Sequence, residues 1–211
     1  GAAFLAGISW EIGWSMLRLP AWVWHPAKAT MRHSAREMRA AVDRIIAERR
    51  GAQGEPGRDI LARLLAARDP QTHQPMSDKQ VADNLLTFIA AGHETTARAL
   101  AWTLYLLARA PQWQQRVRDE VIGACGSARI AARDLDKLPV TSRVLKEAMR
   151  LYPPAPVLSR LAGRDVELGG HRIAKDTLII LPVFAIHRHR KLWTDPDRFD
   201  PDLFLPEHDS E

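Results

Sequence analysis

The segment Ala91-Gly92-His93-Glu94-Thr95-Thr96 combines groups that can hold a proton with a glycine that leaves the backbone accessible. A helix that only had to pack would not carry these residues at its centre. Glycine costs about 1 kcal/mol relative to alanine there, and β-branched threonine costs a few tenths more. A buried carboxylate also costs free energy unless another group pairs with it. Because such breaks in local preference are often functional, this segment is the first candidate site.

The surrounding sequence predicts one long helix that positions this segment. Ser77 and Gln80 form a capping box at its start, Met76 and Val81 can close a hydrophobic staple, and Pro111 ends it. Apolar residues recur at steps of three and four between these limits: Val81, Leu85, Phe88, Ile89, Leu100, Leu104 and Leu107. The helix would be about 45 Å long, and we expect Glu94 and Thr95 near the middle of a rod that crosses the core. With Gly92 beside Thr95, the helix could open a groove in which a flat group approaches the backbone.

A second pair of charged residues lies downstream, at Glu147 and Arg150. Three residues apart on a helix, they share a face and can form an ion pair. Pro153 and Pro154 end that helix and favour an extended continuation. An E-x-x-R spacing by itself carries little information, so its meaning depends on the first segment.

Together these residues resemble the cytochrome P450 family. Residues 91–96 match the family pattern [AG]-G-x-[DE]-T-[TS], and Glu147-x-x-Arg150 matches its second signature. Three further stretches match in the same order: residues 85–88, residues 155–160 and the run from His187 to Pro196. The resemblance implies a mainly α fold, a partial cytochrome P450 fold whose small β element lies towards the C-terminal end.

The resemblance assigns a role to each matching residue. Glu94 and Thr95 would be catalytic and carry protons to bound dioxygen. Ala91, Gly92 and Thr95 would lie against the haem, and Arg160 would bind one of its propionates. Thr87, Ala90, Ala155 and Val157 would line the substrate pocket. Glu147 and Arg150 would be a buried structural pair.

The activity implied is that of a haem-thiolate monooxygenase. It would use O2 and two electrons from a ferredoxin or flavin reductase to hydroxylate a small, apolar organic substrate. The cofactor would be haem, iron protoporphyrin IX, and we expect a cytoplasmic protein. Two alternatives stay open: a peroxygenase-like member of the same fold, and a catalytically silent helical module without haem. For residues 1–211 alone we expect an inactive piece of one domain, truncated at both ends.

Two positions depart from the family pattern. The family's axial cysteine lies in a loop that would follow Glu211, and Cys125, the only cysteine here, has a different context. We expect Cys125 to be a small, half-buried side chain. The family also has an arginine in its P-[ED]-R-F motif, whereas this chain has Leu203 in Pro201-Asp202-Leu203-Phe204. Glu147 and Arg150 must therefore find another partner, because Arg198 lies one motif too early.

Composition excludes other classes of protein. The chain of 211 residues is 46% hydrophobic and carries a net charge of +5, with arginines scattered along amphipathic helices. No apolar run reaches the length of a membrane span, and no nucleic-acid reader motif is present. No metal site is predicted, because the histidines between His187 and Arg190 lack a carboxylate or cysteine set. The W-x-x-x-R spacing of Trp14 and Arg18 is interpreted as a chance match to a haem-propionate motif.

The rest of the sequence predicts mostly helices followed by a small sheet. Helices are expected at residues 25–50, 59–68, 111–122 and 140–151. Val166 to Ile173 would be a hairpin with a Gly-Gly turn. Thr177 to Leu181 would be a third strand paired with that hairpin.

Overall fold

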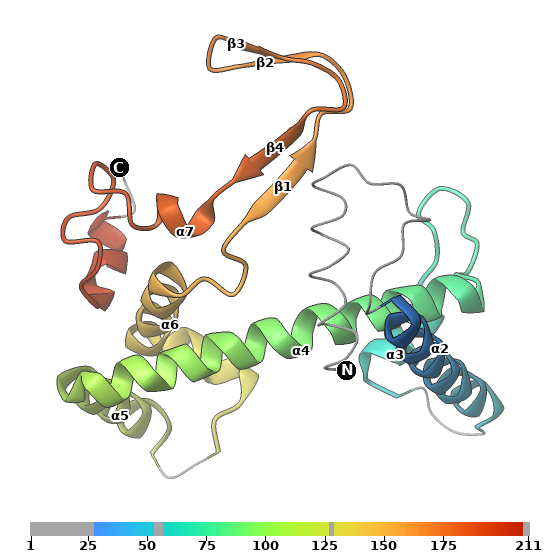
Figure 1. Ribbon diagram of the computed structural model, residues 1–211. Coiled ribbons are helices and arrows are strands. Elements are labelled where there is room, and N and C mark those ends of the chain that lie inside the picture. Colours follow the sequence, from blue (N-terminus) through green and yellow to red (C-terminus); the bar gives the residue numbers. More distant parts are fainter. Residues whose placement is uncertain (1–27, 53–56, 127–128, 209–211) are drawn as a thin grey trace. The chain divides into compact units, whose positions relative to one another are not determined.

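The computed structural model describes residues 28–52, 57–126 and 129–208. Its contacts divide the chain into two compact units, Gly1–Gly92 and His93–Glu211. The boundary falls inside the long helix α4 (Asp78–Arg109), so that helix contributes to both units. Helices greatly outweigh strands (Figure 1), which confirms the mainly α expectation.

The first unit is built from α2 (Lys28–Gly51), α3 (Ile60–Ala66) and the beginning of α4. These helices lie within the predicted ranges, give or take a few residues at their ends. Their apolar faces meet in one buried cluster, which consists of Val42, Ile46, Leu61, Val81 and Ala82. Met76 packs against the same cluster, where the predicted staple with Val81 places it.

The start of α4 has the predicted capping box. The backbone N–H of Ser77 donates to Gln80 Oε1 at 2.8 Å, and the backbone N–H of Gln80 donates to Ser77 Oγ at 3.3 Å. Two N–H groups that have no partner within the helix are thereby satisfied. The sequence therefore sets the position of α4 from its first turn.

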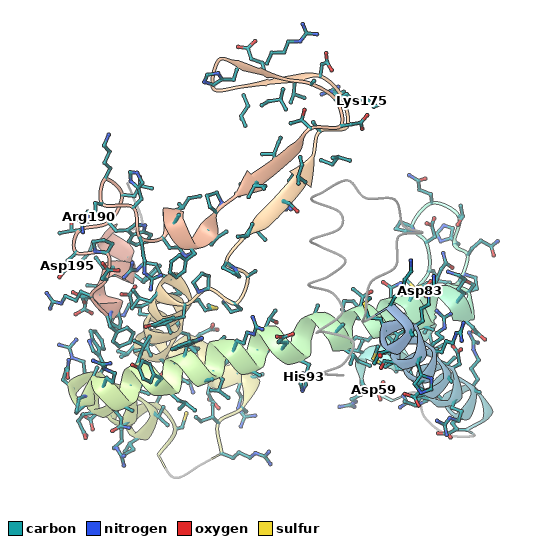
Figure 2. The ribbon with its side chains drawn as sticks, in the orientation of Figure 1. Asp59, Asp83, His93, Lys175, Arg190 and Asp195 are labelled. Carbon is teal, nitrogen blue, oxygen red and sulfur yellow. The ribbon has the colours of Figure 1, made fainter. Side chains whose placement is uncertain are left out.

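An ion pair joins the end of α2 to the start of α3. Asp59 is the N-cap of α3 and accepts from the backbone N–H of Ala62 at 2.9 Å (Figure 2). Arg49 donates to both carboxylate oxygens of Asp59, at 3.0 and 2.7 Å. The Arg49 hydrogen bonds, followed by that of Ala62, lower the pKa of Asp59 to about 2.

This pair predicts an acid-dependent loss of stability. A lowered carboxyl pKa stabilises the folded state above the ordinary value of 3.8, and this stabilisation is lost as the pH falls through about 2. Asp59→Asn should flatten the dependence of unfolding free energy on pH between about pH 4 and pH 2, and Arg49→Gln should do so in part. Urea titrations at several pH values measure this slope. The same slope in wild type and in Asp59→Asn would show that Asp59 does not contribute.

The second unit contains α5 (Pro111–Cys125), the 3-10 helix η1 (Ala132–Lys137), α6 (Pro139–Leu151) and the end of α4. Two small clusters join these helices; their buried members are Leu106, Ala148 and Leu151 in one and Ala110, Trp113 and Val144 in the other. Phe199 packs against both. Glu120 of α5 caps α6: its oxygens accept from the backbone N–H groups of Val140 and Thr141, at 2.6 and 2.8 Å.

The strands form two separate antiparallel pairs (Figure 1). β2 (Val166–Leu168) and β3 (His171–Ile173) make the predicted hairpin. Its two-residue turn has Gly169 and Gly170 at φ 56° and 77°, values that suit glycine. β4 (Leu178–Leu181) pairs with β1 (Leu158–Leu161), with Leu158 opposite Leu181.

The predicted pairing of Thr177–Leu181 with the hairpin is therefore wrong. The backbone hydrogen bonds from Ala162 N–H to Thr177 O and from Asp176 N–H to Ala162 O, at 3.0 and 2.8 Å, extend the β1–β4 pair. The hairpin is an insertion between the two strands of that pair. Sequence periodicity missed β1 because the strand has only four residues and follows a proline-rich run.

After β4 the chain forms α7 (Val183–Ile186), η2 (Pro201–Phe204) and η3 (Pro206–His208). Across the described ranges, no helix combines the length and the apolar character needed to span a membrane. Trp14 and Arg18 lie outside the described residues.

Candidate functional site

The segment from Ala91 to Thr96 lies in continuous α-helix, at the centre of α4. Its side chains are exposed, apart from Glu94, whose side chain is 32% exposed. Phe88, Ile89 and Leu100, expected in the core, are also about half exposed, at 49%, 51% and 54%. The expectation that Glu94 and Thr95 lie in a core-spanning rod is wrong for the part of the chain that the structure describes, because its buried clusters pack on the two ends of α4.

Glu94 forms an ion pair with Arg98, one turn further along α4. This pair was not predicted, although a glutamate four residues before an arginine is a recognisable signal on a helix. The carboxylate stays in contact with solvent while Arg98 holds it on the helix surface. The carboxylate of Glu94 is therefore accessible to water.

Gly92 gives the centre of α4 an open surface. A methyl group placed on its Cα would meet no atom within 4 Å outside the helix's own backbone. Thr95 and Thr96 are exposed, and His93 projects from the same turns (Figure 2). The exposed Phe88 and Ile89 lie within two turns of Gly92, so this stretch of α4 presents an apolar surface beside its polar pair.

The other predicted haem and substrate residues lie at exposed positions. Arg160 is on β1, and its Nη1 donates to the backbone carbonyl of Ser159 at 2.8 Å. Thr87 donates its hydroxyl proton to the Asp83 carbonyl at 2.8 Å. Thr87 and Ala90 belong to the first unit, whereas Ala155 and Val157 belong to the second. Their convergence on one pocket stays a prediction.

Each of these features by itself is compatible with haem, a flat, apolar group that carries carboxylates. In the first unit, Gly92 leaves the surface of α4 open. In the second unit, the exposed guanidinium of Arg160 can donate to a carboxylate. Cys125 is half-buried in the last turn of α5, as predicted. Among the described residues, no three His, Cys, Asp or Glu side chains lie close enough to hold a metal ion.

Glu147 and Arg150 form a fully buried ion pair on α6. Arg150 Nε lies 2.6 Å from Glu147 Oε2, and Arg150 Nη2 lies 2.8 Å from Glu147 Oε1. The side chain of Arg150 is 1% exposed and that of Glu147 is 0% exposed. This two-point geometry is the strongest arrangement for an arginine and a carboxylate, and the predicted pair is confirmed.

Backbone groups complete this pair in place of the family arginine. Arg150 Nη1 donates to the carbonyls of His187 and Pro196 at 2.8 and 2.7 Å, and Nη2 donates to that of Arg198 at 3.0 Å. The backbone N–H of Asp200 donates to Glu147 Oε1 at 2.9 Å. The pair is therefore satisfied with Leu203 in the motif.

Side chains near the Glu147–Arg150 pair make further contacts around it. The guanidinium of Arg198 is exposed and lies 3.9 Å from Asp200, so only its backbone carbonyl takes part. His187 Nδ1 lies 3.2 Å from the Arg150 carbonyl, and Arg150 lies over the Trp193 ring at 4.9 Å. Nothing in the sequence pattern signals the three carbonyl contacts, because backbone acceptors are independent of residue type.

Comparison with known proteins agrees with this geometry. Residues 9–211 match the family described as Cytochrome P450. Pentalenene oxygenase of Streptomyces avermitilis is 35% identical over 196 residues, which cover 93% of this chain and 42% of that protein. Cyclooctat-9-en-7-ol 5-monooxygenase of Streptomyces melanosporofaciens is 37% identical over 168 residues, which cover 80% of this chain and 36% of that protein.

A solved structure, that of retinoic acid bound cyanobacterial CYP120A1, superposes with a TM-score of 0.80 at 32% identity. The superposition covers 90% of this chain and 43% of that one. The chain thus spans less than half the length of the relatives that it matches. Proteins of this family are haem-iron oxidoreductases, so haem is the cofactor. The match over residues 9–211, together with the paired Glu147 and Arg150 and the Glu94-Thr95 segment on α4, shows that this chain belongs to the cytochrome P450 family.

Proposed function

We propose that the protein is a haem-dependent monooxygenase, in which both units belong to one cytochrome P450 domain. It takes O2 and two electrons from a ferredoxin or flavin reductase and hydroxylates a small, apolar organic substrate. When bound, haem supplies the iron centre at which O2 is reduced and one oxygen atom is passed to the substrate. The second oxygen atom leaves as water, which requires two protons.

The observation that carries this proposal is the adjacent carboxylate and hydroxyl of Glu94 and Thr95 on the open centre of α4. Glu94 contacts solvent and is held by Arg98, so it can take up protons and pass them along the helix surface. Thr95 follows directly and presents a hydroxyl that would donate a proton towards the site where O2 is reduced. A peroxide-using enzyme would not need this relay, because its oxidant already carries the protons.

The remaining residues bind and shape the site. Gly92 and Ala91 would leave the helix surface low enough for the haem ring, and Arg160 would donate to a propionate. Thr87, Ala90, Ala155 and Val157 form the wall that faces the substrate and excludes water. The names of the two Streptomyces relatives support an apolar organic substrate, since each names the organic molecule on which it acts.

A reconstitution experiment tests the proposal. The complete gene product is titrated with haem, and a specific shift of the Soret band is expected. Addition of a reductase and its reduced cofactor should then start O2 uptake. No Soret shift would favour the silent helical module. If product forms with hydrogen peroxide but not with O2 and the reductase, the peroxygenase alternative is favoured.

A further inference from the structure

We propose that Trp102 and Tyr105 of α4 form an electron relay, which reduces the haem site when O2 has been activated but no substrate is oxidised. The inference rests on the proposed monooxygenase function, because a one-electron oxidant has to form at the haem. Such an oxidant damages the haem and the surrounding protein unless a nearby group reduces it. Tryptophan and tyrosine are, with cysteine, the side chains that give up one electron most readily.

Trp102 lies on the same face of α4 as Thr95, the residue proposed to stand beside the reacting oxygen. Seven residues separate the two, which amounts to a rotation about 20° short of two full turns and an advance of about 10 Å along the helix. Both belong to the same unit, so α4 itself fixes their spacing. An electron can tunnel through protein over such a distance, and Trp102 is therefore placed to supply the first electron.

Both tyrosines of the chain are in ring contact with Trp102. The chain has only two, Tyr105 and Tyr152. The ring of Tyr152 stacks on that of Trp102 with centroids 3.9 Å apart and an interplanar angle of 5°, and the ring of Tyr105 meets it edge-on at 5.5 Å. Both are favourable arrangements of aromatic pairs. Contact between the rings allows an oxidised indole to take an electron from a phenol.

The surroundings of the two tyrosines place the end of the relay at Tyr105. A guanidinium lies 5.6 Å from the centre of each ring, that of Arg109 at Tyr105 and that of Arg188 at Tyr152. This fixed charge opposes a radical cation but not a neutral radical, so either phenol must lose its proton together with its electron. Tyr105 is 43% exposed and can release the proton to water, whereas Tyr152 is half-buried. The Tyr105 oxygen also accepts from Arg109 Nη1 at 2.8 Å, so its own proton is directed elsewhere.

The transfer moves one electron and one proton out of Tyr105. The oxidant takes an electron from the indole of Trp102 and is itself reduced by one equivalent. The phenol of Tyr105 then returns an electron to the indole, loses its proton to water and becomes a neutral radical. A thiol or ascorbate in solution donates the hydrogen atom that restores the phenol.

Pulse radiolysis of the complete protein tests the transfer between the rings independently of the haem. Azide radicals oxidise tryptophan, and the absorption of the tryptophanyl radical is followed as it gives way to that of a tyrosyl radical. Trp102→Phe and Tyr105→Phe should each lower the yield of tyrosyl radical, and Tyr152→Phe should lower it less. Trp113→Phe is the matched control and should leave the yield unchanged, because Trp113 belongs to the same unit but packs with Val144. Each substitution keeps an aromatic ring.

The haem-loaded complete protein without substrate tests the link between the haem site and the relay. Hydrogen peroxide is added, the mixture is frozen rapidly, and electron paramagnetic resonance records radicals on the protein. We expect a tyrosyl signal that narrows when the tyrosine rings are deuterated and that is lost in Tyr105→Phe. Trp102→Phe should lose the same signal and bleach the Soret band faster, whereas Trp113→Phe should behave as the wild type does.

Three results would overturn the relay. Equal tyrosyl yields in wild type and Trp102→Phe after azide oxidation would show that the rings pass no electron, whether or not haem is bound. If the haem-loaded protein hydroxylates its substrate but gives no Tyr105 signal, the haem site does not feed the relay, and the proposed monooxygenase function is untouched. If the complete protein binds no haem, the monooxygenase proposal fails first, and the relay has no oxidant to reduce.

Discussion

Glu147→Ala is expected to lower the free energy of unfolding by about 3–5 kcal/mol, the largest stability effect predicted for this chain. The substitution leaves the guanidinium of Arg150 charged and buried without its carboxylate. It also removes the acceptor of the Asp200 N–H group, so the segment that follows α7 loses an anchor. Urea denaturation measures the free energy of unfolding. Hydrogen exchange shows whether the backbone amides of α6 lose protection.

Two further variants serve as controls for this prediction. Glu147→Gln keeps the shape and an acceptor oxygen but not the charge, so most of the loss should remain. Arg172→Ala breaks the exposed ion pair with Asp165 and should change stability by less than about 1 kcal/mol. Similar losses in Glu147→Ala and Arg172→Ala would mean that the buried pair contributes no more than a surface ion pair.

The second large effect concerns Thr95. In the complete protein, loaded with haem and supplied with a reductase, Thr95→Ala should divert reduced cofactor from product to hydrogen peroxide. Loss of a positioned proton donor typically lowers the catalysed step by about 10²- to 10⁴-fold. The ratio of product formed to reduced cofactor consumed measures the effect, with peroxide assayed in parallel.

Thr96→Ala is the matched control for this prediction. Thr96 is the same residue type on the same exposed stretch of α4, but it points about 100° away around the helix. Both substitutions raise helix propensity by a few tenths of a kcal/mol, so a stability effect would appear in both. Unchanged coupling in Thr95→Ala, or equal loss in Thr96→Ala, would remove Thr95 from the proposed role.

The local elements of the fold could be predicted because short stretches of sequence determine them. The capping box of Ser77 and Gln80 specifies the start of α4, and Gly169-Gly170 specifies the β2–β3 turn. The β1–β4 pairing could not be predicted in this way. Its strands are separated by the inserted hairpin, so only contacts distant in sequence define the pairing.

Features of the candidate site that depend on local spacing could be predicted, whereas features that depend on contacts distant in sequence could not. The spacing of Glu147 and Arg150 predicts that they meet on one face of α6, and they form a buried ion pair there. The exposure of the residues around Glu94 could not be predicted from periodicity, because apolar spacing marks a face of a helix but does not say what covers it. The spacing of four residues could have predicted the Glu94–Arg98 pair. No spacing rule predicts the backbone carbonyls that contact Arg150.

Completion of the Arg150 site by main-chain groups has a consequence for mutational tolerance. Substitution of a side chain cannot delete a carbonyl, so the contacts from His187, Pro196 and Arg198 survive most single exchanges at those positions. What must be preserved is the path of the chain from His187 to Asp200, not the identity of one cationic residue. Position 203 is thereby released to vary, while a proline at 200, which removes the N–H group, becomes the harmful exchange.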